Sequence, residues 1–153
     1  MDWQKRKYKE IDTVLTGKAP ELLQKFYGTY KVIGRNRKVN KNIYELKFYP
    51  SEKGNPVLRF YDKDGNEFEF WNTPEECDVG QSPSGDFTSL SCGRLGDRKG
   101  YDHFSIFNGV KWVNDFTKQF HPKEIPIDEK IYHYYSYGGF GTPILEMSLQ
   151  KVE

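Results

Sequence analysis

The three histidines, His103, His121 and His133, are the side chains of this chain best suited to acid–base or metal chemistry. Imidazole changes its charge near neutral pH and is also a common zinc ligand. Their wide spacing gives no local ligand geometry and no C-x-x-C pattern accompanies them, so we expect neither a metal site nor a cofactor. A cofactor-free isomerase, cyclase or lyase, with His103 or His133 as general acid/base and a tyrosine as donor, is one hypothesis. The sequence shows no G-x-S-x-G, P-loop or dinucleotide fingerprint, and a non-enzymatic role is preferred.

Cys77 and Cys92 are the only cysteines. In a secreted protein the two could form one disulfide. The opening MDWQKRKYKE lacks the apolar core of a signal peptide, so we favour reduced thiols in a cytoplasmic chain. No apolar run is long enough to span a bilayer. Lys and Arg number 23 against 22 Asp and Glu, which gives no overall attraction to nucleic acid or to an anionic membrane. We therefore expect a small hydrophobic molecule or a protein as partner, and neither nucleic acid nor membrane.

A tyrosine-rich run, IYHYYSY at 131–137, precedes the glycine-rich GGFGT. Alternation in a strand puts Tyr132 and Tyr134 on one face, and His133, Tyr135 and Tyr137 on the other. A strand that is aromatic on both faces is buried on both or lines a cavity with one. We take His133, Tyr135 and Tyr137 as candidate ligand-binding residues, and the glycines as a hairpin end rather than an RNA-recognition motif.

Asn108-Gly109, within HFSIFNGVKWVNDF, is the dipeptide that a two-residue hairpin turn prefers. This turn would pair His103 with Asn114 and Ser105 with Trp112. One face of the hairpin then carries a mixed polar and aromatic set, which would orient a ligand if it pointed into a cavity: His103, Ser105, Trp112 and Asn114. The alternative is that this face meets solvent and the apolar face, with Phe104, Ile106 and Val113, forms the core.

The elements that must position these residues are mostly strands. Apolar residues at helical spacing predict an amphipathic helix over 3–16, and Pro20 opens a second helical turn that Gly28 ends. Alternation then predicts a strand in NIYELKFY, a hairpin in VLRFYDKDGNEFEFW with Arg59 facing Glu67 or Glu69, and a short strand in FTSLS. IYHYYSY and PILEMSLQK are the last strands. Three stretches are expected to be loops: NTPEECDVGQSPSGD, CGRLGDRKG and FTKQFHPKEIPIDEK.

About eight or nine short strands with regular turns predict an all-β fold with one short N-terminal helix, as an antiparallel up-and-down barrel. One domain spans 1–153, with a helical segment over 1–26 and the barrel over 27–152. A cone-shaped α+β fold, with the helix over a curved sheet, is the structural alternative and would favour the enzyme hypothesis.

The stretch LLQKFYGTYKVIGRN resembles the opening of lipocalins and other calycins, where a helical turn precedes a Gly-x-Trp motif in the first barrel strand. Gly28-Thr29-Tyr30 stands at that place, with tyrosine instead of tryptophan. The resemblance implies an up-and-down barrel with a small-molecule cavity, and Tyr30 and Tyr44 join the candidate ligand-binding residues. We therefore expect a non-enzymatic binding protein for a small hydrophobic or aromatic ligand. The alternative is an interaction domain of the inhibitor or immunity type that uses exposed tyrosines around 132–137.

Overall fold

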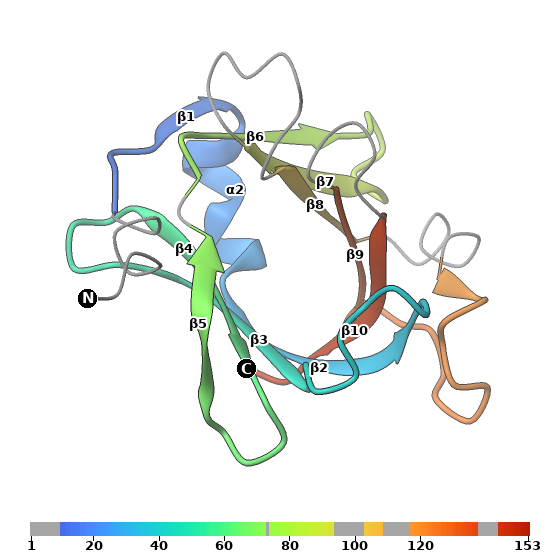
Figure 1. Cartoon of the computed structure of the whole chain (residues 1–153). Coiled ribbons are helices and arrows are strands. Elements are labelled where there is room, and N and C mark those ends of the chain that lie inside the picture. Colours follow the sequence, from blue (N-terminus) through green and yellow to red (C-terminus); the bar gives the residue numbers. More distant parts are fainter. Residues whose placement is uncertain (1–9, 73, 94–102, 109–116, 138–143) are drawn as a thin grey trace.

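The computed structural model describes residues 10–72, 74–93, 103–108, 117–137 and 144–153, with only the backbone described for 69–72 and 137. Within these residues ten strands form a single curled sheet, and one helix accompanies it (Figure 1). The elements in chain order are β1 (Val14–Gly17), α2 (Ala19–Phe26), β2 (Gly28–Arg35), β3 (Glu45–Pro50), β4 (Pro56–Tyr61), β5 (Glu67–Asn72), β6 (Glu76–Gln81), β7 (Thr88–Gly93), β8 (His103–Asn108), β9 (Ile131–Tyr137) and β10 (Leu145–Lys151).

The strand order is β1-β6-β7-β8-β9-β10-β2-β3-β4-β5. Neighbours along the chain pair antiparallel from β2 to β5 and from β6 to β10, and β10 also pairs with β2. The all-β class with one short helix is confirmed. A purely antiparallel arrangement is not, because β1 runs parallel to β6. The helix predicted over 3–16 is wrong at its end, since Val14–Gly17 forms this strand, and residues 1–9 lie outside the described part.

The short helix α2 lies where the sequence predicts a helical turn. Pro20 stands in its first turn, where the missing backbone N–H costs nothing, and Glu21 and Lys25 complement the helix dipole at its two ends. Ala19, Leu23 and Phe26 share one buried face, which packs on β1, β6 and β7. The helix ends at Phe26, and the extended backbone of Tyr27 leads into β2.

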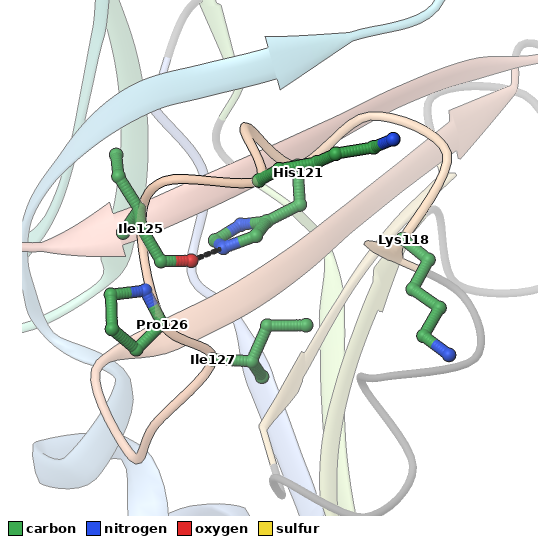
Figure 2. Close-up of a pocket in the computed structure, with 6 residues that line it drawn as sticks. Lys118, His121, Ile125, Pro126 and Ile127 are labelled. Carbon is green, nitrogen blue, oxygen red and sulfur yellow. Dashed lines mark hydrogen bonds between the residues drawn. The ribbon is translucent and has the colours of Figure 1, made fainter.

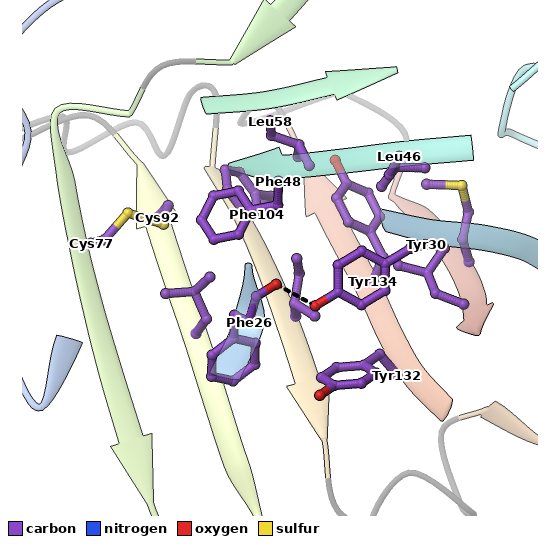
Figure 3. Packing of buried hydrophobic residues seen from close by; sticks show 14 of the residues in the cluster. Phe26, Tyr30, Leu46, Phe48, Leu58, Cys77, Cys92, Phe104, Tyr132 and Tyr134 are labelled. Atoms are coloured by element: carbon purple, nitrogen blue, oxygen red, sulfur yellow. Dashed lines mark hydrogen bonds between the residues drawn. A yellow bond between two sulfur atoms is a disulfide. The ribbon is translucent and has the colours of Figure 1, made fainter. Parts of the chain in front are cut away.

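One face of each strand supplies the core. The buried inward set comprises Tyr30, Leu46, Phe48, Leu58, Phe60, Cys77, Val79, Leu90, Cys92, Phe104, Ile106, Tyr132, Tyr134, Met147 and Leu149 (Figure 3). Aromatic rings meet edge to face, as Phe48 does with Phe104 at 6.3 Å, or stack, as Phe104 does with Tyr134 at 6.1 Å. The apolar face of residues 103–108 therefore points inward. In the tyrosine run, Tyr132 and Tyr134 point inward as well.

Two expectations about the middle of the chain are overturned. The predicted loop 72–86 contains β6, in which Cys77 and Val79 alternate with polar residues and are buried. Cys77 lies directly opposite Cys92 of β7, with a Cα–Cα distance of 4.2 Å, and the two form a disulfide. The expectation of reduced thiols is therefore wrong.

The register of β8 differs from the hairpin that Asn108-Gly109 predicts. β8 pairs with β7 on one edge and with β9 on the other along its whole length. Neither edge of His103–Asn108 is left for residues 110–114, which lie outside the described residues. Both edges of β8 are thus occupied by strands distant in the chain.

The hairpin of β4 and β5 agrees with the sequence prediction. The Asp62 carboxylate accepts the backbone N–H groups of Asp64 and Asn66, both at 2.9 Å, and Gly65 adopts a φ of 82°. These bonds lower the pKa of Asp62. Arg59 pairs with Glu67 at 2.7 Å across the strands, as the alternation predicts.

Candidate binding site on the outer face

The predicted ligand-binding residues lie at separate places. Tyr30 is fully buried in the core, whereas Tyr44 is 45% exposed, with the Arg35 guanidinium 5.5 Å from its ring centre. Tyr44 therefore does not join Leu46 and Phe48, which are buried in the core. Trp112 and Asn114 lie outside the described residues, as does the side chain of Tyr137.

The remaining four predicted residues share the outer face of β8 and β9. Ser105 lies opposite Tyr135, and His103 lies opposite the backbone of Tyr137, one row along the sheet. The next row pairs Phe107 with His133. The structure thus brings together side chains that the sequence suggested in two separate stretches, but on the side of the sheet away from the core.

A turn-containing segment, residues 117–127, packs over this outer face, and we call it the covering segment. It covers His133, which is only 1% exposed and lies between the rings of Phe107, at 5.9 Å, and Phe120, at 6.4 Å. The His133 Nε2–H donates to the Glu146 carboxylate at 2.9 Å, so Nδ1 accepts the Thr117 hydroxyl at 3.3 Å. Burial lowers the pKa of His133, although the nearby Glu146 acts in the opposite direction. His133 is therefore a neutral, closely held ring that attaches the covering segment to β9 and β10.

A second histidine and a glycine hold the middle of the covering segment. His121 donates from Nε2 to the carbonyl of Ile125, and its Nδ1 lies 3.3 Å from the Ser148 hydroxyl on β10. On β2, the carbonyl oxygen of Phe120 would lie 1.0 Å from a Cβ at Gly34. Only glycine permits this approach, so the sequence of β2 fixes how closely the segment packs on the sheet.

The covering segment contains an open groove of about 450 Å³ (Figure 2). Its wall is mostly apolar, and the lining residues are Lys118, His121, Lys123, Ile125, Pro126 and Ile127. Lys118 and Lys123 are exposed, and neither forms an ion pair with any residue that the structure describes. The sequence predicts only a loop for this stretch. The signal available was the apolar Ile125-Pro126-Ile127 within an otherwise charged loop.

The core around Tyr30 leaves less room for a ligand than the groove does. Tyr30, Phe48, Leu90, Phe104 and Leu149 are each 0% exposed, so none of them borders a space that water could enter. Tyr30 donates its hydroxyl to the carbonyl of Phe26 and packs edge-on against Tyr132 at 5.1 Å. At this level the curl of the sheet is filled by side chains.

Comparison with known proteins gives no family for the chain: no family model matches it, and no curated protein or solved structure matches it significantly. In the part of the chain that the structure describes, no helix has the length and apolarity to cross a bilayer. The same residues bring no three potential metal ligands together. The function is therefore inferred from the geometry of the outer face.

Proposed function

We propose that the chain is a non-enzymatic binding protein for a small hydrophobic ligand, and that the ligand occupies the groove of the covering segment. The groove itself, at about 450 Å³, is the observation that carries the proposal. Its volume falls within the range of small-molecule sites, whose walls are mostly apolar with a few polar groups. The sequence favoured the same class of function but placed the ligand inside a barrel.

The anchors of the covering segment support this choice of site. His121, His133 and Gly34 hold the segment against the sheet through contacts within the chain. A wall that is already ordered loses little conformational entropy on binding, so more of the contact energy appears as affinity.

A calycin-like barrel is the finer architecture that we propose. The strands follow one another around the curl from β6 to β10 and from β2 to β5, and β10 pairs with β2. Tyr30, at the place of the calycin tryptophan, is buried beside Tyr132, over whose ring the Lys151 ammonium lies at 5.9 Å. These contacts support the resemblance that the Gly28-Thr29-Tyr30 motif suggests.

We adopt neither alternative function. Tyr132 and Tyr134 are 3% and 4% exposed, so these two tyrosines do not supply the interaction surface that the inhibitor hypothesis needs. Of the two histidines in the enzyme hypothesis, His133 is buried between two phenylalanine rings, so a substrate does not reach it in this conformation. His103 is partly exposed but does not line the groove. The groove is open to solvent and requires no rearrangement.

Fluorescence of the neutral probe N-phenyl-1-naphthylamine tests the proposal. Ile127→Glu places a carboxylate in the apolar wall, and its desolvation should weaken probe binding about ten-fold. Val152→Glu is the matched control, because Val152 is 48% exposed and lies outside the groove. Absence of probe binding to the unaltered protein, or equal weakening by both substitutions, would contradict the proposal.

A further inference from the structure

We infer that the ligand of this groove is a single amphiphile with an anionic head and an apolar tail, such as a medium-chain carboxylate. This inference rests on the proposed function and adds the chemical class of the ligand. It follows from how charge and apolar surface are distributed along the groove.

The two ends of the groove differ in character. Figure 2 shows Ile125 and Pro126 at one end and Lys118 at the other, with His121 and Ile127 between them. A ligand that lies along the groove therefore meets apolar surface over most of its length and an ammonium group at one end. This arrangement suits a tail that is removed from water and a charged head that stays near it.

The charged groups around the groove favour an anion over a cation. Lys118 and Lys123 are the charged lining residues, and neither has an ion-pair partner among the described residues. The nearby Glu124 is exposed but does not line the groove, and the Glu146 carboxylate is bonded to His133. Two lysines with no compensating carboxylate in the lining attract an anionic head and repel a cationic one.

His121 does not serve as a further head-group ligand. Both of its ring nitrogens are engaged, one with the carbonyl of Ile125 and the other with the Ser148 hydroxyl. Its ring is thus a wall of the groove, and recognition of the anion falls to the two lysines. The volume of about 450 Å³ suits one molecule rather than a membrane surface.

The test compares three ligands with the same tail: decanoate, decanol and decyltrimethylammonium. Each displaces N-phenyl-1-naphthylamine from the unaltered protein, from Lys118→Gln/Lys123→Gln and from the control Lys41→Gln/Lys63→Gln, whose lysines are exposed and lie outside the groove. We expect decanoate to bind about ten-fold more tightly than decanol, and the cation to bind more weakly than decanol. The groove variant should lose this preference, so that decanoate no longer binds more tightly than decanol. The control variant should keep it, as should Lys118→Arg/Lys123→Arg, which retains both charges.

The failures of the two proposals are distinguishable. If none of the three ligands and no probe binds, the proposed function fails. If decanol and decanoate bind equally well to the unaltered protein, or the groove variant keeps the preference for decanoate, the groove binds ligands but the anionic class is refuted. Binding to phosphatidylglycerol vesicles without binding of monomeric decanoate would refute the single-amphiphile proposal.

Discussion

Gly34→Ala is the substitution that most directly tests how the covering segment is held. The added methyl group would lie 1.0 Å from the carbonyl oxygen of Phe120 and 2.2 Å from its carbonyl carbon. Ordinary carbon–oxygen contacts are about 3.5 Å, so the backbone at Phe120 must move away from β2 by more than about 2 Å. The methyl group meets backbone atoms of Phe120, and Gly34 lies in a strand that is paired with β10. Rotation of a side chain therefore cannot relieve the overlap.

The magnitude follows from the contacts that this displacement breaks. The bonds from Thr117 to His133 and from His121 to Ser148 are already 3.3 Å long, and a further displacement of this size ends them. Each contributes about 1 kcal/mol net, and the stacking of Phe120 on His133 adds about 1 kcal/mol. We expect Gly34→Ala to lower the free energy of unfolding by about 3 kcal/mol, a large part of the stability of a small domain.

Urea unfolding followed by circular dichroism measures this loss, and hydrogen exchange locates it. The Phe120 amide, which donates to Thr117 at 2.9 Å, should lose protection. Gly80→Ala is the matched control, because Gly80 lies in β6 with nothing within 4 Å of the new methyl group. It should stabilise the protein by no more than about 1 kcal/mol, because alanine suits the interior of a strand better than glycine. If the two variants unfold within about 0.5 kcal/mol of each other and the Phe120 amide stays protected, the steric reasoning is wrong.

Three further predictions concern other parts of the molecule. Replacing both Cys77 and Cys92 by serine should cost about 3 kcal/mol, because the disulfide closes a loop of 15 residues, and thiol titration of the unaltered denatured protein should find no free thiol. Burial lowers the pKa of His133 in the folded protein. As pH falls below about 6.5, this histidine therefore gains a proton in the unfolded chain before it does so in the folded one. Stability should therefore fall with pH below that point, and His133→Asn should unfold with a shallower pH dependence. Tyr30→Phe should cost about 1–2 kcal/mol in thermal or urea unfolding, because the carbonyl of Phe26 loses its buried donor; no loss would contradict that bond.

The sequence predicts best those strands that bury one face. The alternation of Leu46 with Lys47, and the turn at Asp62–Asn66, reflect a simple division between core and solvent, and the structure follows both. β6 was missed because it carries only Cys77 and Val79 as buried apolar residues, within a stretch rich in Pro, Ser and Gly. The parallel strand β1 has only 4 residues, too few for strand alternation to be recognised after residues with helical spacing.

The tyrosine run shows why the inward face was not predictable. Both faces of residues 131–137 are aromatic, so alternation assigns each side chain to a face but does not indicate which face points into the core. The choice depends on partners distant in the chain, because Tyr134 lies opposite Ile106 on β8 and Met147 on β10. The outer face of β9 is also covered, by the covering segment, whose sequence shows neither strand nor helix periodicity. The candidate groove is formed by that segment, which is why its residues were not among the predicted ones.

The pairing of β10 with β2 has a consequence for how the sheet is assembled. The strands β2–β5 form one meander and β6–β10 another, and each could fold from neighbouring hairpins. The two are joined where β10 pairs with β2, and β1, which precedes both meanders in the chain, pairs with β6. Pairs so distant in the chain carry a large loop-closure entropy, which slows folding. During synthesis, the two meanders cannot pair until β10 has left the ribosome, so a chain stalled before β10 would expose the edges of both β2 and β9 to aggregation.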